Sequence, residues 1–138
     1  MEEQARSGYR EIEHTADWEL EVWGPDMAAL VEQAALGMYS LCGVRLKKDS
    51  RVTRQFFLFT IEPEFMLVWF LEELLWILED DKVAFERFNM SVDGNVIQAD
   101  LVGAEVESLT KEIKAVTYHN LEIKRGVRGL EVRIVFDV

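Results

Sequence analysis

The sequence predicts an α+β fold in which two helices pack on a mostly antiparallel β-sheet, forming a single two-layer domain of residues 1–138. Segments with the two-residue apolar period of strands and segments with the helical period both occur along the chain. Their order is strand, helix, strand, helix and then several consecutive strands, which favours helices packed against antiparallel strands. The 138 residues are 49% hydrophobic, enough to bury a core without disulfides.

The first strand is predicted for Asp17 to Trp23, where apolar residues alternate with carboxylates. Asp17 falls on the polar side of this strand. Asp26 follows a Gly-Pro break and is the predicted N-cap of a helix whose apolar residues recur at helical spacing as far as Leu41. Gly43 is expected to end that helix.

A second strand and a second helix follow. Arg51 to Ile61 is rich in Phe, Val and Thr, which are typical of strands. The run Phe56 to Phe59 is apolar on both sides, which predicts burial on both faces. Pro63 marks the start of a helix with an apolar stripe from Leu67 to Leu78.

Two tryptophans, Trp69 and Trp76, lie two turns apart on the second helix, off the centre of its apolar stripe. We expect them to widen the buried face of the helix. The alternative is that they form an exposed patch that faces a partner protein.

Four further strands are predicted at Lys82–Met90, Asn95–Glu105, Glu112–Lys124 and Leu130–Val138. The pair Asp93-Gly94 predicts a short hairpin between the first two. In the last strand apolar residues alternate with polar ones, and Asp137 falls on the polar side.

The chain is strongly acidic, with a net charge of -11 and a sequence pI of about 4.6. Tight direct binding to RNA or DNA is therefore not expected, because phosphate contacts need clustered Lys and Arg. An acidic surface suits metal ions or a basic protein partner.

Nothing in the sequence indicates export or membrane insertion. The first ten residues are polar, and the apolar run Phe65 to Leu78 contains two glutamates and is too short to span a bilayer. Cys42 is the single cysteine, which excludes an internal disulfide and is compatible with a reducing compartment. We expect a cytoplasmic protein in which Cys42 is a small buried hydrophobe and not a nucleophile.

Asp17 and Asp137 occupy the polar sides of two predicted strands. If these strands pair antiparallel, the start of one lies beside the end of the other, and the two aspartates meet. Such a pair must share a proton or hold a cation, and the carboxylate of Val138 adjoins it. Three oxygen donors suit a hard ion such as calcium, magnesium or manganese better than zinc. The alternative is two unrelated, solvated surface aspartates.

Three further residues are candidates for function. His14 and His119 could each act as a base or a ligand, with a structural hydrogen bond as the alternative. Lys114 could balance the carboxylates or grip a phosphate, or it could be an ordinary strand lysine. Because the chain has no Gly-rich phosphate loop, zinc-ligand spacing or nucleophile elbow, the residues alone name no reaction and no catalytic residue.

Several motifs occur together along nearly the whole chain. They are HTAD at His14 to Asp17, the apolar helix Met27 to Leu41, ELL at Glu73 to Leu75, KAVTYHNLEI at Lys114 to Ile123, and the terminal FDV. In this combination the chain resembles the archease family. Archeases are small accessory proteins of RtcB-type RNA ligases, which join RNA ends in tRNA splicing through a guanylylated histidine of the ligase.

The resemblance implies that this chain promotes guanylylation of such a ligase, sustains its multiple turnover and alters its nucleotide specificity, without catalysis of its own. The family's metal site, usually described with calcium, maps onto Asp17, Asp137 and Val138. Magnesium or manganese are the other expected ions. Two departures from the family pattern, Trp18-Glu19 after HTAD and Asn120 after TYH, bear on metal affinity.

Two rival functions belong to other classes. The same carboxylates could serve a metal-dependent hydrolase. A general chaperone or interaction module would instead present Trp69 and Trp76 to its clients.

Overall fold

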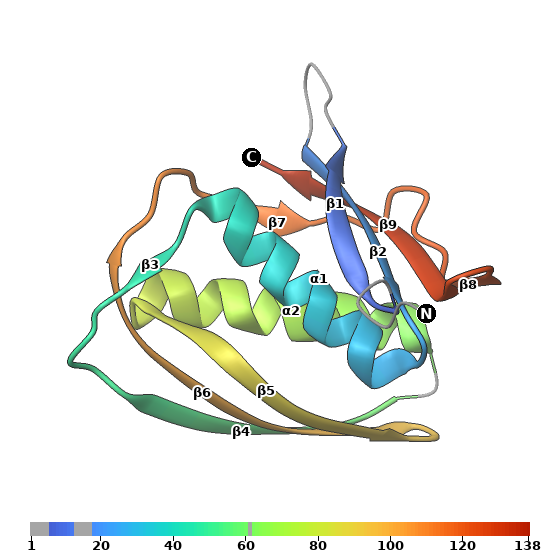
Figure 1. Cartoon of the computed structure of the whole chain (residues 1–138), viewed down its shortest axis with the longest axis horizontal. Coiled ribbons are helices and arrows are strands. Elements are labelled where there is room, and N and C mark those ends of the chain that lie inside the picture. The colour runs from blue at the N-terminus through green and yellow to red at the C-terminus, as the bar shows by residue number, and fades with distance from the viewer. Residues whose placement is uncertain (1–5, 13–17, 61) are drawn as a thin grey trace.

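The computed structural model describes residues 6–12, 18–60 and 62–138, and these contain two helices and nine strands (Figure 1). The elements are β1 Gly8–Ile12, β2 Trp18–Gly24, α1 Met27–Cys42, β3 Arg45–Leu46, β4 Val52–Phe59, α2 Pro63–Asp80, β5 Val83–Asp93, β6 Val96–Ser108, β7 Ala115–Val116, β8 Lys124–Gly126 and β9 Gly129–Asp137. The predicted α+β class is confirmed.

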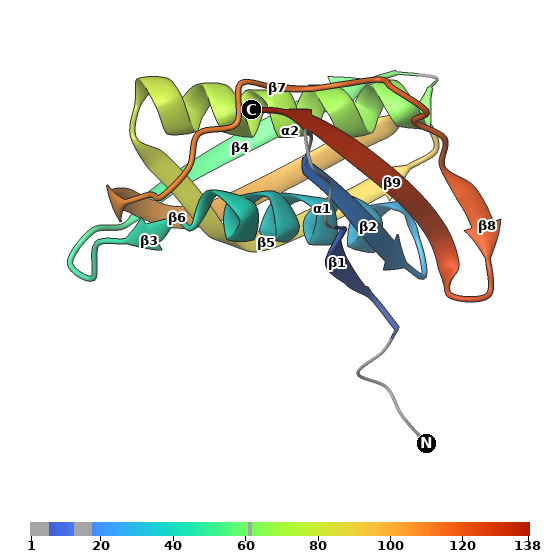
Figure 2. The same cartoon turned by 90° about the horizontal axis from the view of Figure 1, so that it is seen from above.

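The strands are divided between two antiparallel sheets, where the sequence predicted a single sheet in a two-layer domain. One sheet has the order β1-β2-β9-β7, and β8 also pairs with β9. In the other, β3, β4 and β5 all pair with the long strand β6. The helices lie between the sheets (Figures 1 and 2), since α1 contacts β1 and β2 on one side and β5 on the other. Both sheets and both helices contribute to one apolar core.

Local signals in the sequence placed the helix ends correctly. The Asp26 carboxylate accepts a hydrogen bond from the Ala29 N–H at 2.9 Å, as an N-cap does. Gly43 has a φ of 66° and its N–H donates to the Ser40 carbonyl, which ends α1 in the left-handed turn that glycine favours. Pro63 is the first residue of α2. The predicted hairpin at Asp93-Gly94 joins β5 to β6.

The prediction that Phe56 to Phe59 is buried on both faces is wrong. Phe57 and Phe59 are 69% and 66% exposed. Phe56 points inward, where its ring lies edge-on to Phe70 with centroids 5.8 Å apart. The helices cover one face of the β4-β5-β6 sheet (Figure 1). The two exposed phenylalanines lie on the outer face.

The two tryptophans of α2 behave differently from each other. Trp69 is half-buried and packs edge-on against Phe56 with centroids 6.2 Å apart, so it does widen the buried face. Trp76 is 59% exposed, which contradicts the prediction for that residue. The packing of β4 against the N-terminal half of α2 reaches Trp69 and leaves Trp76 at the surface.

The strand predicted for Glu112–Lys124 is also wrong over most of its length. Only β7 and the first residue of β8 are extended strand within it. Carboxylates of α2 accept the backbone hydrogen bonds that a neighbouring strand would otherwise take. The Val116 N–H donates to Glu72 Oε2 at 2.8 Å, and the Ile123 N–H donates to Glu64 Oε2 at 2.9 Å.

Neither helix in the described part of the chain is long and apolar enough to cross a membrane.

Candidate functional site

The two strands that border the predicted metal ligands lie side by side. β2 and β9 pair antiparallel, with Trp18 opposite Phe136. The start of β2 and the end of β9 therefore lie at the same end of the sheet (Figure 1). The predicted meeting of Asp17 with Asp137 requires this pairing direction. Asp17 and His14 themselves lie outside the described residues.

Asp137 is exposed, one position beyond the buried Phe136. Its backbone carbonyl accepts a hydrogen bond from the Lys114 N–H at 2.7 Å, and Ala115 lies opposite it in β7. No hydrogen bond or ion pair joins the Asp137 carboxylate to another described residue. Both of its oxygens are available to a cation.

Val138 is half-buried and packs against the apolar core, which fixes the backbone next to Asp137. An exposed carboxylate beside such a fixed backbone offers oxygen donors alone, which suits a hard cation. Among residues 6–12, 18–60 and 62–138, no three His, Cys, Asp or Glu side chains are grouped to hold a metal ion. The predicted ligand set includes Asp17, outside these ranges.

Two lysines border this end of the sheet. Lys114 is joined to Asp137 through the backbone, and its exposed side chain lines a cavity of about 360 Å³ together with Leu75 and Glu112. Lys111 places its ammonium 5.1 Å from the centroid of the Trp18 ring, within cation–π range. Sequence reasoning missed Lys111, because its segment contacts Trp18 only through the tertiary fold.

His119 is not brought to Asp137. Thr117 donates its N–H to the Val135 carbonyl, and the chain then runs along β9 away from Asp137. His119 is exposed, and its ring Nε2 lies 3.2 Å from the Asn120 amide nitrogen. Its contacts with the described residues are those of a turn residue, and none of these contacts favours a role as a base.

Comparison with known proteins shows the family of this chain. The family model of the archease protein family matches residues 9–138. The chain belongs to the archease family. Among curated archeases, that of Methanosarcina barkeri is 32% identical over 139 residues, covering 94% of this chain and 95% of the relative. The archease of Archaeoglobus fulgidus is 28% identical and covers 94% of this chain and 98% of its own.

Two solved structures share the fold of this family member. The solution structure of Methanobacterium thermoautotrophicum protein 1598 matches with a TM-score of 0.71 at 22% identity, over 95% of this chain and 99% of that chain. The crystal structure of a Thermotoga maritima archease, described as a possible chaperone, matches with a TM-score of 0.71 at 25% identity, over 94% and 96% of the two chains.

Cys42 is not placed to act as a nucleophile. It is fully buried at the end of α1, as expected from the sequence. Burial raises the pKa of the Cys42 thiol to about 11. The thiol therefore stays protonated at neutral pH and is a poor nucleophile.

An ion-pair network lies on the same sheet, toward the opposite end of β2. Glu21 accepts from Arg10 at 2.6 Å and from Arg128 at 3.1 Å, while the Arg128 guanidinium lies 4.0 Å from the Trp23 ring centroid. The Arg10 hydrogen bond, with that of Arg128, lowers the pKa of Glu21 against the opposing effect of burial. Sequence reasoning missed this network because it joins β1, β2 and the β8–β9 turn, and β1 was not predicted.

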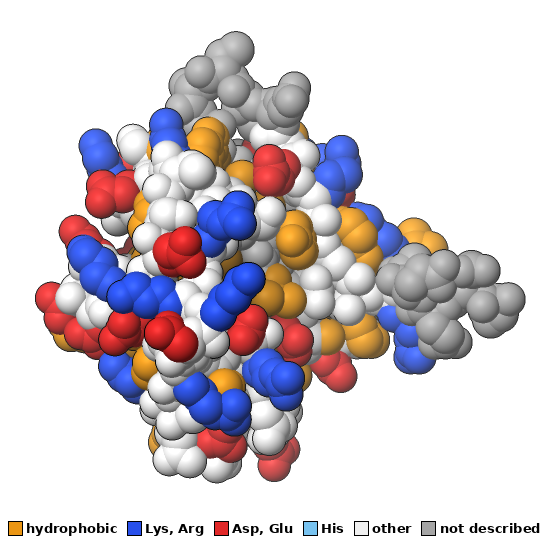
Figure 3. All heavy atoms as spheres, turned by 60° about the vertical axis from the view of Figure 1, so that its left-hand side comes forward, with side chains coloured by type: hydrophobic (Ala, Val, Ile, Leu, Met, Phe, Trp, Pro, Cys, Tyr) orange, Lys and Arg blue, Asp and Glu red, His pale blue; other side chains and the backbone are white. Residues whose placement is uncertain are grey.

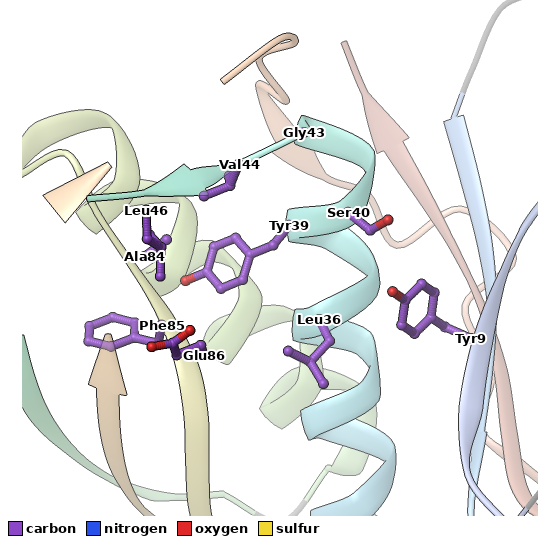
Figure 4. A pocket seen from close by; sticks show the side chains of 10 residues that line it. All are labelled: Tyr9, Leu36, Tyr39, Ser40, Gly43, Val44, Leu46, Ala84, Phe85 and Glu86. Carbon is purple, nitrogen blue, oxygen red and sulfur yellow. The ribbon is translucent and has the colours of Figure 1, made fainter. Parts of the chain in front are cut away.

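A cavity of about 660 Å³ lies beside α1 (Figure 4). Tyr39 points from α1 toward β5, and Tyr9 lies on the other side of the helix. Burial raises the pKa of the Tyr39 hydroxyl, which approaches the Phe85 backbone. Glu86 is the carboxylate at this cavity, and of the described site residues neither Asp137 nor Val138 lines it. The cavity is therefore separate from the end of β9.

Proposed function

We propose that this archease is an accessory activator of an RtcB-type tRNA-splicing RNA ligase. It promotes guanylylation of the ligase, sustains multiple turnover and alters the nucleotide that the ligase accepts. The proposal is supported by the family match over residues 9–138. The structural observation that carries it is the antiparallel pairing of Trp18 with Phe136, which the predicted site requires.

In this proposal Asp17, Asp137 and the carboxylate of Val138 form the strand-end site and hold a divalent cation. Calcium is the first choice, and magnesium or manganese are the alternatives, because the donors are all oxygens. The bound ion would supply a concentrated positive charge for phosphate oxygens. The exposed Asp137 carboxylate, without a described cation partner, supports its assignment as a ligand.

The protein's own residues bind and orient, and the chemistry belongs to the ligase. The buried Cys42 and the outlying His119 support a protein without catalysis of its own. The acidic charge supports a basic protein partner over direct RNA binding. The proposal places the protein in the cytoplasm.

The test is a ligation time course with RNA in excess over an RtcB-type ligase, after chelation and re-addition of defined metals. We expect Asp17→Asn and Asp137→Asn to lower the stimulated rate by about tenfold or more, since each removes a charged ligand. Asp93→Asn, an exposed aspartate on the β5–β6 hairpin, is the matched control. Full stimulation by both site variants would refute the strand-end site.

The same proteins distinguish the rival functions. Phosphatase or esterase turnover with manganese or magnesium that is lost in Asp137→Asn would replace the proposal with a metal-dependent hydrolase. Protection of unrelated clients from aggregation, unaffected by both aspartate variants and without any effect on ligation, would replace it with a general chaperone.

A further inference from the structure

The outward face of α2 carries exposed aromatic side chains. Phe65 and Trp76 are 43% and 59% exposed, and Tyr118, in the segment after β7, is 54% exposed. Positions 65 and 76 share one face of an α-helix, and Figure 2 shows α2 along one edge of the molecule with β7 beside it. The α2 patch consists of these aromatics and the carboxylates that flank them: Phe65, Trp76, Tyr118, Glu62, Glu73 and Asp80.

The segment that leads to Tyr118 is held against α2 by a defined contact. The Val116 N–H donates to Glu72 Oε2 at 2.8 Å, which fastens β7 to the helix two residues before the tyrosine. Partial burial, together with the charges of Glu62 and Glu72, raises the pKa of Tyr118. The ring therefore lies within electrostatic reach of both carboxylates and belongs to the same surface as the helix face.

The charged side chains of α2 itself are of one sign. Seven carboxylates and no Lys or Arg lie between residues 62 and 81. Glu64 and Glu72 accept backbone hydrogen bonds, and Asp81 pairs with Arg54. Glu62, Glu73 and Asp80 have no cation partner among the described residues. On the face in Figure 3, Lys and Arg lie among Asp and Glu.

The α2 patch and the strand-end site share a short strand. In β7, Ala115 lies opposite Asp137, and the next residue, Val116, bonds to Glu72 of α2. A protein that covered the patch would therefore also lie next to the end of β9. One partner surface can reach both.

We propose that the α2 patch is the docking surface for the ligase, through a ligase segment that presents an apolar strip flanked by Lys and Arg. Exposed aromatic residues are the usual anchors of protein interfaces, and the unpaired carboxylates complement a basic partner. A membrane or nucleic acid would be repelled by the same carboxylates. This inference rests on the proposed function for the identity of the partner. In it, the α2 patch determines the affinity for the ligase, and the strand-end site determines the stimulation of ligation.

The first experiment measures binding of the purified ligase and the protein concentration that gives half-maximal stimulation. Phe65→Ala with Trp76→Ala is expected to weaken binding and raise that concentration about tenfold or more, with maximal stimulation recovered at saturation. Phe57→Ala with Phe59→Ala is the matched control, since these side chains are at least as exposed but lie on the outer sheet face. Asp137→Asn is expected to bind within about twofold of the unmodified protein and fail to stimulate.

The second experiment tests binding at the α2 patch without the ligase, so its result does not depend on which protein is the partner. A synthetic amphipathic helix with a Leu/Trp strip between two Lys rows is titrated into the labelled protein, and amide shifts are followed by NMR. A peptide of the same composition in scrambled order is the control for non-specific attraction. We expect shifts at residues 62–80 and at Tyr118, and about tenfold weaker binding by Glu73→Lys with Asp80→Lys.

The possible outcomes either overturn or support the α2 patch as a docking surface. Patch variants that bind both ligase and peptide like the unmodified protein would overturn the inference. Sedimentation that shows a dimer dependent on Trp76 would also overturn it, since a second copy would then be the occupant. Specific peptide binding to the patch with no ligase binding would support the surface for a basic protein segment and refute the proposed function.

Discussion

Two glutamates of α2 hold the chain segment that runs beside this helix. Glu64 and Glu72 accept backbone N–H groups of the segment after β6, at Ile123 and Val116. Both hydrogen bonds are partly buried, where an unmet donor is costly. A helix side chain thus replaces a strand partner, and an alternating sequence that reads as a strand does not form one.

Glu64→Ala should therefore destabilise this segment. Leaving the partly buried Ile123 N–H without an acceptor is expected to cost about 1–3 kcal/mol of unfolding free energy. Urea denaturation measures the loss, and hydrogen exchange of the Ile123 amide shows whether the loss is local. Glu79→Ala, at an exposed position of the same helix, is the control. Unchanged exchange at Ile123 would contradict the role of Glu64.

Glu21 makes stability depend on pH. Hydrogen bonds from Arg10 and Arg128 lower its pKa, so its contribution is present above the ordinary value of 4.5 and is lost as pH falls through the lowered pKa. We expect Glu21→Gln to be less stable at pH 7 by about 0.5–1 kcal/mol, because solvent screens both arginines. Thermal unfolding is measured from pH 7 to below pH 4. The stability lost on acidification should be smaller in Glu21→Gln than in Glu86→Gln. An equal loss of stability on acidification in the two variants would contradict the role of Glu21.

At the scale of elements, local sequence signals correctly predicted the features that depend on neighbouring residues, such as the ends of α1. Asp26 and Gly43 bound α1 as expected, because caps depend on residues within one turn. Burial of Phe57 could not be predicted, since it depends on whether another element covers that sheet face. The pairing of β2 with β9 is intermediate between these two cases. The alternation in β2 and β9 was readable, but their pairing is a long-range choice that the family motifs supported.

A substitution at Gly43 tests what stabilises the C-terminal end of α1. Its φ of 66° disfavours any other residue, and an added Cβ would collide with the Thr110 hydroxyl, which donates to the Cys42 carbonyl at 3.1 Å. Gly43→Ala is expected to lose about 2 kcal/mol, from backbone strain and the displaced hydrogen bond.

Gly94→Ala is a matched control for Gly43→Ala. Gly94 has a similar φ of 59°, but nothing lies within 4 Å of an added Cβ. Its loss should be limited to about 1 kcal/mol of backbone strain. Chemical denaturation compares the two variants. Equal losses would mean that the contact with Thr110 adds nothing to the end of the helix.

At the scale of the whole molecule, distant parts of the sequence meet at β9. This strand pairs with β2 from the start of the chain and with β7, and β7 is bonded to α2. The end of β9, the five-stranded sheet and α2 are therefore connected through strand pairing and the hydrogen bond from Val116 to Glu72. A cation held at the strand-end site would bridge β2 and β9, and so stabilise the folded state against unfolding as a whole.

This link predicts a thermal signature of the proposed metal. A ligand that binds only the folded state stabilises it by about 2.7 kcal/mol at 100 times its dissociation constant. For a chain of this size that is a rise in Tm of about 10 °C. Calcium should produce this rise in the unmodified protein and in Asp93→Asn, but not in Asp137→Asn. The same rise in Asp137→Asn would show that the ion binds elsewhere, because removing one carboxylate of a three-donor site leaves too little charge to hold it.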